Sequence, residues 1–591
     1  MTFSDRRSSA STRPVALATG CVLTLVLLLG AAGRPAGAVP IEPPLAGSGP
    51  AFRADLAAAA RIDPIDPARN APEPGAPLRV DGAVTDAIAA EGWAEVLIGL
   101  ADGVPDTAPL DSLARAAAEA SAQLLASLGP EDFQLHKTYS HLPIVAGSVS
   151  ASGLEKLRRN PRVTAIDDDV WVYPLVAPAA ALAAPLGLVE SLPSIGADKV
   201  HAMGIKGEGI GVAVLDTGID NSHPDFENAI VDQYCFSSGT NSCVSESGRG
   251  VAKGPNAQDE QGHGTGVSGI VLGRGKVAPV GVAPEANLIA VRVFRDTGGA
   301  PTNDIVDGLN FVVANQAKHN IRAANMSLGG GAALGTNCDN QYGSVKQVFQ
   351  TLLARNVAIF VATGNGGNPD RVAFPGCISN GTGVGSTFDA DLEAARMGGG
   401  LVGCLGGKAM VSRLDIACYT DRGRAMDIVA PGSYIVTARL GGGSSGSGPY
   451  GGGHGTSYAS PTAAGVAALI FSADPKIHAR DIERLLQQTG EIVIHPESGA
   501  EIKRVNAYNA VLAVLPATPT AEHTPTSAPS ATPQPPTITA TAETPPTDAP
   551  TQAPEPSETP EPSRTPARTA TATEAPGAAV FLPLLRKGQA P

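Results

Sequence analysis

The sequence predicts an α/β fold in which a parallel sheet has helices on both faces, preceded by a small α+β domain. From about residue 190 to 515, near-continuous apolar runs that end in turn residues alternate with runs of helical period. This alternation is typical of parallel strands that are buried on both sides by helices. Between residues 90 and 175, a shorter β-α-β-α-β pattern is complete in itself, which indicates a separate α+β domain.

The first 38 residues have the layout of a secretory signal peptide. Three arginines precede the apolar stretch "VALATGCVLTLVLLLGAA", and "AGA" follows at 36–38. A basic start, an apolar core and a small-residue cleavage site direct export, so we predict cleavage after Ala38. An uncleaved membrane anchor is the alternative, because the apolar stretch is about long enough to span a bilayer. Residues 39–89, rich in Pro and Ala, are predicted to be a loose leader.

The small domain, residues 90–175, is predicted to alternate strands and helices. Strands are expected at 93–100, 144–151 and 163–174, and helices at 110–129 and 152–160. Its acidic run, Asp167–Asp169, is expected to be in solvent. An accessible linker, residues 176–189, follows this domain.

The large domain, residues 190–515, carries the alternating pattern. Strands are expected at 211–218, 288–294, 323–329, 358–366 and 381–386, and helices at 303–320, 343–356, 457–473 and 479–490. In such sheets, ligands bind outside the carboxyl ends of the strands. The residues that carry chemistry are therefore expected there.

The composition changes sharply after Leu515. Residues 516–576 consist mainly of Pro, Thr, Ala, Ser and Glu, which cannot bury a core, and are predicted to be a disordered stalk. Residues 577–591 form a tail with an apolar run too short to span a bilayer.

Charge and cysteine usage exclude some functions. The net charge of −14 argues against a nucleic-acid partner, and no cluster with metal-ligand spacing is present in the sequence. Without Cys21, which lies in the signal peptide, six cysteines remain, and an even number in an exported chain favours disulfides. Six cysteines allow 15 connectivities, of which we expect the sequential pairs, Cys235–Cys243, Cys338–Cys377 and Cys404–Cys418.

Three polar residues stand at strand ends or helix starts. Asp216 ends "GVAVLDTG", His263 lies in "GHGTGVSG", and Ser457 lies in "GGGHGTSYASP". A serine hydroxyl needs a base to become a nucleophile, an imidazole supplies the base, and a carboxylate orients the imidazole. The glycines let a substrate approach closely. His454, in the same glycine loop, is expected to face solvent.

A fourth residue completes the set. Asn365, in "FVATGNGG", follows a buried strand among glycines. Its side-chain amide can donate to an oxyanion, together with the backbone N–H of Ser457 at the start of a helix.

The order Asp, His, Ser, with "VLDTGID…HPDF", "GHGTGVSG", "GTSYASP", "MSLGG", "ATGNGG" and "DIVAPG", resembles the subtilisin-like serine peptidases. The resemblance covers about 190–515. It implies that Asp216, His263 and Ser457 are a catalytic triad and Asn365 an oxyanion donor. It also implies that residues 90–175 are an inhibitory propeptide, which the enzyme removes from itself between about Tyr173 and Leu188.

The same resemblance assigns a substrate groove, with the substrate added as a strand. One edge would be Ser327, Leu328 and Gly329. The opposite edge would lie in "TGGA", 297–300, with Gly298 and Gly299. Neither "SLGG" nor "TGNGG" carries a charge, so apolar or aromatic side chains are expected at P1, the residue whose carbonyl is attacked.

Three positions depart from the family pattern. Gly266 stands where a second histidine is usual, Gly366 where some relatives carry a glutamate, and Tyr458 where methionine is usual. No cofactor or metal is required for the chemistry. Structural calcium is compatible with the family, but not beside Asp225, because the neighbouring loop "LGRGKVAPVGVAP" offers Arg274 and Lys276 in place of oxygen ligands.

The sequence thus predicts a secreted, monomeric serine endopeptidase that acts on proteins or peptides, has its own propeptide as inhibitor and binds no nucleic acid. The stalk and tail make association with the cell surface an open alternative to free release. Two other functions stay open: a catalytically inactive binding module, and a related acyl-transfer enzyme such as a ligase or esterase.

Overall fold

The computed structural model describes residues 78, 80–175, 191–238, 242–245, 248–296, 298–393, 404, 406–444 and 453–516. The predicted signal peptide, the linker 176–189 and the tail lie outside the described residues. So do residues 39–77 and 79 of the predicted leader and all of the predicted stalk except Pro516. The chain divides into two units, Met1–Thr518 and Pro519–Pro591.

The large domain is built on an 11-stranded sheet whose centre is parallel. In spatial order the central strands are β7 (Ile230–Phe236), β11 (Asn287–Arg292), β6 (Gly211–Asp216), β13 (Ile321–Met326), β15 (Ala358–Ala362), β17 (Thr382–Phe388) and β20 (Ile428–Ile435). At the edges lie β10 (Lys253–Gly254), β23 (Gly453–His454), β25 (Glu501–Arg504) and β24 (Glu491–Ile494). The α/β fold class is confirmed.

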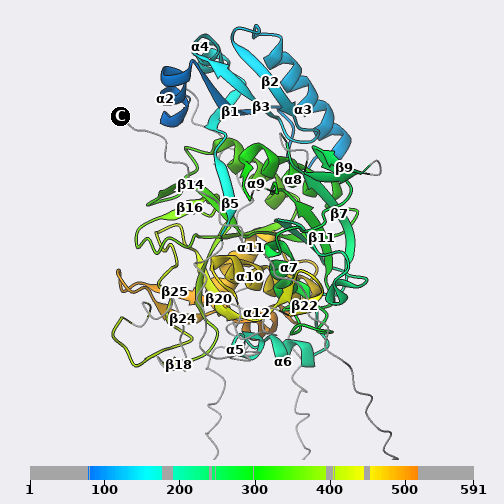
Figure 1. Cartoon of the computed structure of the whole chain (residues 1–591), viewed down its shortest axis with the longest axis vertical. Coiled ribbons are helices and arrows are strands. Elements are labelled where there is room, and N and C mark those ends of the chain that lie inside the picture. The colour runs from blue at the N-terminus through cyan, green and yellow to red at the C-terminus, as the bar shows by residue number, and fades with distance from the viewer. Residues whose placement is uncertain are drawn as a thin grey trace, which may run out of the picture. The chain divides into compact units, whose positions relative to one another are not determined.

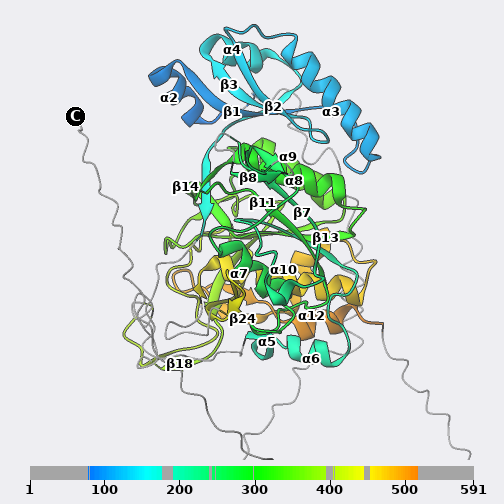
Figure 2. The same cartoon turned by 45° about the vertical axis from the view of Figure 1, so that its right-hand side comes forward.

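Helices cover both faces of this sheet (Figures 1 and 2). On one face lie α8 (Thr302–Asn315) and α9 (Gly343–Ala354). On the other lie α7 (His263–Leu272), α10 (Thr456–Ala473), α11 (Ala479–Thr489) and α12 (Ala507–Val514). Each group has its own apolar core against the sheet. Helix α10 is buried almost all round, which explains its run of small and apolar residues.

Shorter elements connect these parts. They are α5 (Ser191–Ser194), α6 (Ala197–Ala202), the 3₁₀ turn Pro224–Phe226, β8 (Cys243–Ser245), β9 (Gly248–Val251), β18 (Leu392–Glu393), β19 (Met410–Val411), β21 (Ala438–Arg439) and β22 (Gly443–Ser444).

The small domain is an antiparallel sheet with helices. Its strands, in the order β2 (Phe133–Thr138), β3 (Ile144–Ser150), β1 (Trp93–Leu100) and β4 (Val163–Asp168), pack against α2 (Gly82–Glu91), α3 (Leu110–Leu125) and α4 (Ala151–Arg159) around one apolar core. Helix α2 and Val80 belong to this core, so the compact part begins inside the stretch predicted to be loose. Its Ala-rich sequence has little amphipathic pattern, so periodicity did not reveal it.

One predicted strand, 163–174, is two strands in different sheets. After β4, the chain leaves the small domain, and β5 (Trp171–Pro174) pairs in the order β12-β5-β14-β16 with strands of the large domain. Those strands are β12 (Ala300–Pro301), β14 (Leu328–Leu334) and β16 (Val372–Phe374). The small domain therefore delivers its last strand into the large domain.

The acidic run Asp167–Asp169, at the end of β4, is not in solvent as a whole. Asp167 is buried and accepts hydrogen bonds from the backbone N–H groups of Gly343 and Ser344, at 3.1 and 2.7 Å. Asp169 accepts one from the N–H of Asn303 at 2.9 Å. These donors begin α9 and α8, so the carboxylates cap helices of the other domain, a long-range contact that a charge run alone does not indicate.

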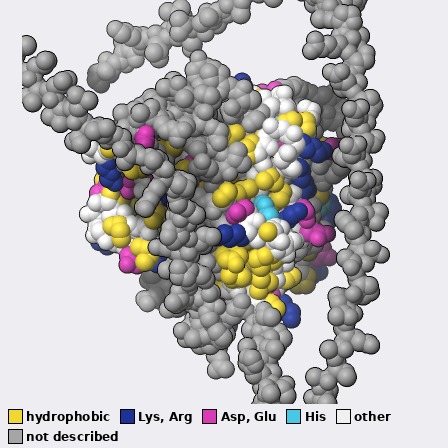
Figure 3. All heavy atoms as spheres, turned by 90° about the horizontal axis from the view of Figure 1, so that it is seen from below, with side chains coloured by type: hydrophobic (Ala, Val, Ile, Leu, Met, Phe, Trp, Pro, Cys, Tyr) yellow, Lys and Arg dark blue, Asp and Glu magenta, His cyan; other side chains and the backbone are white. Residues whose placement is uncertain are grey.

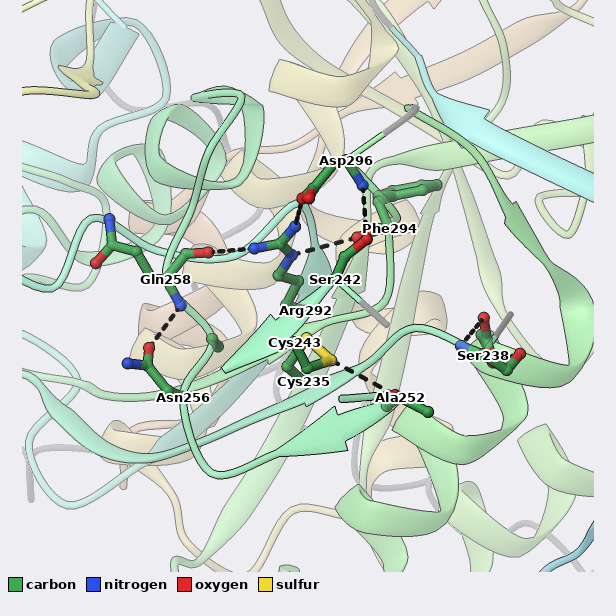
Figure 4. The surroundings of a disulfide bond; sticks show 12 residues. Cys235, Ser238, Ser242, Cys243, Ala252, Asn256, Gln258, Arg292, Phe294 and Asp296 are labelled. Atoms are coloured by element: carbon green, nitrogen blue, oxygen red, sulfur yellow. Dashed lines mark hydrogen bonds and ion pairs between the residues drawn. A yellow bond between two sulfur atoms is a disulfide. The ribbon is translucent and has the colours of Figure 1, made fainter. Parts of the chain in front are cut away.

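Six cysteines form three disulfides, Cys235–Cys243, Cys338–Cys377 and Cys404–Cys418. The first joins the end of β7 to β8, and nearby the buried Arg292 organises the ends of several segments (Figure 4). Its guanidinium donates to the carbonyl oxygens of Gln258 and Phe294, at 2.7 and 3.2 Å, and pairs with Asp296.

The surface carries hydrophobic side chains among charged ones. On the face drawn in Figure 3 they gather around a histidine, in the area that undescribed residues leave uncovered. Among the described helices, none has the length and apolar character needed to cross a membrane.

Candidate active site

Asp216 and His263 meet at the carboxyl edge of the sheet. Asp216 is the last residue of β6, and His263 is the first of α7. Nδ1 of His263 donates to Oδ1 of Asp216 at 2.8 Å, and both side chains are buried. This bond directs Nε2 of the imidazole away from Asp216, as a general base requires.

The start of α7 is fixed by residues that the sequence reasoning missed. Thr217 accepts a hydrogen bond from the N–H of Gly264 at 2.8 Å. Asp259 accepts from the N–H of Gly262 at 2.8 Å and from that of Thr265 at 3.0 Å. A Cβ atom at Gly264 would lie 2.3 Å from the carbonyl oxygen of Gly218, so only glycine fits beside His263. The motif "DTG" was the available signal for Thr217.

The electrostatics favour a basic imidazole. Burial by itself lowers the pKa of His263, but the charge and hydrogen bond of Asp216 raise it, and the net pKa lies above the usual value. The carboxylate thus stabilises the imidazolium that forms when His263 accepts a proton.

Ser457 stands in the first turn of α10 and points at the small domain's last strand. Its hydroxyl donates to the carbonyl oxygen of Leu175, which follows β5. Ser457, the candidate nucleophile, is therefore hydrogen-bonded to a peptide carbonyl. Nε2 of His263, the candidate base, is buried and has no hydrogen-bond partner among the described residues.

Pro461 explains why the first turn of α10 is hydrogen-bonded to the predicted substrate edge. Pro461 lies past the first turn and has no N–H, so the carbonyl of Ser457, four residues before it, lacks its helical donor. The hydroxyl of Ser327 donates to that carbonyl at 2.8 Å instead. This bond joins the helix that carries Ser457 to the predicted substrate edge.

Asn365 directs its amide at the same carbonyl. Nδ2 donates to the oxygen of Leu175 at 2.6 Å. Oδ1 accepts from the N–H and the hydroxyl of Thr456, at 2.9 and 3.0 Å, which fixes the orientation of the amide. The predicted oxyanion donor is thus in place, while the bonds to this oxygen come from Asn365 and the Ser457 hydroxyl rather than from the Ser457 N–H.

The glycine before the helix has a steric role. Gly455 has φ +147°, and a Cβ there would lie 3.0 Å from Nδ2 of Asn365 and 3.2 Å from the Leu175 oxygen. A side chain would crowd both the donor and the bound carbonyl. The small residues of "GGGHGTS" therefore make room for a peptide.

The predicted edge at Ser327, Leu328 and Gly329 lies against β5. In the antiparallel register, Leu328 is opposite Pro174 and Gly329 is opposite Tyr173. The N–H of Leu175 donates to the carbonyl of Ser327 at 3.3 Å. Residues 171–175 thus occupy this edge as an added strand.

The opposite edge lies slightly later in the sequence than predicted. Ala300 is opposite Val172 and Pro301 is opposite Trp171. Gly299 lies under Tyr173, because a Cβ there would be 2.7 Å from its ring, whereas Gly298 forms a turn and a Cβ there would meet nothing within 4 Å. Thr297 lies outside the described residues. Thr302, which the sequence reasoning missed, donates through its N–H and its hydroxyl to the carbonyl of Val170, at 2.9 and 2.8 Å.

His454 does not face solvent, contrary to the sequence-based expectation. It is 7% exposed, and its Nδ1 accepts from the N–H of Tyr434 at 3.1 Å. Burial lowers the pKa of His454 to about 4, so it is neutral near neutral pH. Pairing of β23 with β20 buries it, a tertiary effect that its glycine-rich surroundings conceal.

Two departures from the family pattern lie next to each other. A Cβ at Gly266 would be 3.8 Å from the hydroxyl oxygen of Tyr458, and the Tyr458 ring lies 6.4 Å from that of His263. The absence of a side chain at Gly266 leaves room for the tyrosine, so we treat the two departures as coupled.

The carboxylate of Asp225 accepts hydrogen bonds from backbone N–H groups of the loop that follows α7. It is buried and accepts from the N–H groups of Val277 and Ala278, at 3.0 and 2.9 Å, and from that of Lys276. Nζ of Lys276 pairs with Glu227 beside it. These donors do not suit a calcium ion, which needs oxygen ligands. In the described parts of the chain, no group of three or more His, Cys, Asp or Glu side chains is placed to hold a metal ion.

Comparison with known proteins decides the family. Residues 207–542 match the family model described as the subtilase family. The chain belongs to the subtilases. The match covers more than half of the chain and contains all four of the polar residues just described, Asp216, His263, Asn365 and Ser457. Membership assigns this subtilase to the serine-type endopeptidases.

Curated relatives agree with this assignment. Alkaline serine exoprotease A of Vibrio alginolyticus is 27% identical over 364 residues, which is 61% of this chain and 57% of that protein. Subtilisin E of Bacillus subtilis is 26% identical over 60% of this chain and 77% of its own length. M-protease of Shouchella clausii is 26% identical over 61% and 77%. The N-terminal domain of this subtilase lies outside the residues that the family model matches.

Proposed function

We propose that this subtilase is an extracellular serine endopeptidase, made as a precursor that cleaves itself after Leu175. One observation carries the proposal: the carbonyl oxygen of Leu175 accepts hydrogen bonds from both Asn365 and Ser457. With residues 171–175 paired to both edges, the small domain presents its own end as a substrate would.

In the proposed mechanism, His263 accepts the Ser457 proton at Nε2 as Oγ attacks the carbonyl carbon. Asp216 holds the imidazolium through Nδ1. The negative oxygen of the tetrahedral intermediate stays with Nδ2 of Asn365 and the positive end of α10. Collapse breaks the peptide bond, His263 gives its proton to the leaving amine, and water then hydrolyses the acyl-enzyme by the same steps. No metal takes part.

The small domain acts as an inhibitor in this proposal. After cleavage, β5 would remain paired in the groove, and contacts outside the groove would hold the domain. Nζ of Lys137 pairs with Asp304 and Asp307 of α8, at 3.1 and 2.6 Å. Asp167 caps α9. The mature enzyme would cleave other proteins only after the released small domain has left the groove.

Location and partners follow from the sequence and the relatives. The signal-peptide layout and the relatives support an extracellular enzyme. In this proposal it acts as a monomer on protein substrates. Association with the cell surface through residues 516–591 is the alternative to free release. Leu175 at P1 supports a preference for apolar side chains there. Calcium is not expected at Asp225.

The test is N-terminal sequencing of the secreted protein. Wild type should begin at Val176, whereas Ser457→Ala should accumulate as an uncut precursor in a host without proteases. As a matched control, Leu175→Met keeps an apolar side chain and should mature normally, whereas Leu175→Asp should not. Normal maturation of Ser457→Ala would contradict the proposal.

Two assays separate the other functions. A serine-directed phosphonate labels Ser457 only if the site is catalytic, so failure to label would favour an inactive binding module. Casein compared with a simple ester distinguishes an endopeptidase from an esterase. Turnover of the ester alone would contradict peptide-bond hydrolysis.

A further inference from the structure

The side chain of Leu175 lies beside Gly329 and Ala373. A Cβ at Gly329 would lie 3.1 Å from Cδ1 of Leu175 and 3.3 Å from Cβ of Ala373, so both side chains lie on one side of Gly329. Ala373 stays half-buried although Leu175 is in place. We take Gly329 and Ala373 as lining the P1 pocket, in which a side chain longer than leucine would approach Ala373.

A carboxylate also lies near Ala373. Gly364, one residue before Asn365, has φ +115°, and a Cβ there would be 2.1 Å from Oδ2 of Asp421 and 3.2 Å from Cβ of Ala373. Ala373 thus lies near both Leu175 and Asp421. Asp421 is only 4% exposed.

The charge of Asp421 is stabilised mainly by hydrogen bonds, with a smaller contribution from the positive charge of Arg422. Oδ1 accepts from the N–H and the side-chain amide of Asn368, at 2.7 and 2.6 Å, and the N–H of Gly366 also donates to the carboxylate. Arg422, the next residue, pairs with Glu497. Burial raises the pKa of Asp421 against the effect of these hydrogen bonds. A positive charge in the pocket would compensate the buried carboxylate.

We propose that Asp421 is a specificity-determining residue that lets the P1 pocket take lysine and arginine side chains as well as leucine. The inference rests on the proposed function. A lysine extends two atoms beyond the Cδ atom of a leucine. Its aliphatic part would lie where Leu175 lies, and its ammonium would reach Oδ2 of Asp421. The motifs "SLGG" and "TGNGG" carry no charge, because the charge comes from a distant part of the chain.

The test uses mature enzyme and three peptides that differ only at P1: leucine, lysine and norleucine, the uncharged analogue of lysine. Wild type should cleave the leucine and lysine peptides, and should prefer lysine to norleucine. Asp421→Asn keeps the hydrogen-bond acceptor and should lower kcat/KM for the lysine peptide at least about tenfold while changing the leucine peptide less than about twofold. Asp370→Asn removes an exposed carboxylate (76% exposed) and is the matched control.

The pH profile gives a second readout. The ratio of kcat/KM for lysine to that for leucine should rise with pH in wild type as Asp421 ionises, and should be flat in Asp421→Asn. Because His263 affects both peptides alike, its titration cancels in the ratio. A wild type that rejects lysine, or an equal loss on both peptides in Asp421→Asn, would overturn the inference. No turnover of the leucine peptide would refute the proposed function, and this inference with it.

Discussion

Asn365 is held by the same residues that present Ser457. Its Oδ1 accepts two hydrogen bonds from Thr456, the neighbour of the proposed nucleophile, so its Nδ2 is directed at the reacting oxygen before any substrate charge develops. A donor that needs no reorganisation in the reaction stabilises the transition state more than the bound substrate.

Asn365→Ala is therefore expected to lower kcat with little change in KM. The loss should be about 3–4 kcal/mol in transition-state free energy, the size typical of a lost oxyanion donor in this family. Steady-state kinetics on one peptide would measure it. Thr456→Val, which removes one of the two hydrogen bonds that orient the amide, should lower kcat by less. An undiminished kcat in Asn365→Ala would remove this residue from the oxyanion site.

Tyr458 occupies the position at which relatives carry an oxidisable methionine. A sulfoxide there would place a polar oxygen beside the reacting carbonyl, and tyrosine cannot form one. Peroxide should therefore leave most activity of wild type, whereas Tyr458→Met should become sensitive, as a time course on one substrate would show. Met326 adjoins the substrate edge but is fully buried, which should protect it. Equal, rapid loss in both forms would contradict the prediction.

At the scale of elements, the sequence predicted strands whose residues are uniformly buried. Strands β6, β13 and β15 are of this kind. Strand β7 was missed because most of its residues are only partly buried, and β20 because it contains Pro431 and Gly432. Helix α7 was missed because it begins "HGTG", which local propensity assigns to a turn.

The residues of the candidate site also fall into two groups, those that the sequence indicates and those that it does not. Asp216, His263, Asn365 and Ser457 each stand at an element end that the sequence marks with glycines. The place of Leu175 could not be predicted, because it depends on β5 leaving one sheet for another. Asp421 likewise reaches the pocket through tertiary packing beneath Gly364. Local sequence marks the ends of elements, whereas contacts between distant elements depend on the complete fold.

The contact between Asp167 and α9 should depend on pH. Burial raises the pKa of Asp167 to about 7, although the hydrogen bonds from Ser344 and Gly343 lower it. In the unfolded chain an aspartate titrates near 4. The folded form thus binds the proton of Asp167 more tightly than the unfolded chain does. Binding of this proton stabilises the fold fully below about pH 4, and the stabilisation is lost as the pH rises through about 7.

The uncut Ser457→Ala precursor allows a direct comparison with and without Asp167→Asn, which does not titrate. The form with Asp167 should lose stability relative to the asparagine form as the pH rises from 4 to 8, by up to about 4 kcal/mol. Calorimetry at each pH would measure this, and other titrating groups cancel in the difference. Glu91→Gln, at the exposed end of α2, is the control. Parallel pH profiles would contradict the prediction.

At the scale of the whole molecule, β5 connects the two domains. It continues the small domain and ends in the proposed site of the large one, so under the proposed function a single segment would link inhibition to maturation. The contacts of Asp167 and Asp169 lie directly before it. Displacing the small domain would therefore remove the helix caps and the strand in the groove together.

The body of the enzyme should not need the residues beyond Thr518, where the first unit ends. Helix α12 is the last described helix. Ala507, Ala510 and Val511 are fully buried in the core that α10 shares, and the N–H of Ala507 donates to the carbonyl of Ile195 at 2.8 Å.

A chain that ends after Thr518 keeps these contacts and should fold, mature and cleave like the full chain. A chain that ends after Asn506 loses them, and should be less stable by several kcal/mol, because burying one valine side chain alone contributes about 1.5–3 kcal/mol. Thermal midpoints of the two Ser457→Ala precursors, with activity of the two wild-type forms, would measure this. A chain ending after Thr518 that failed to fold would show that residues 519–591 stabilise the enzyme body.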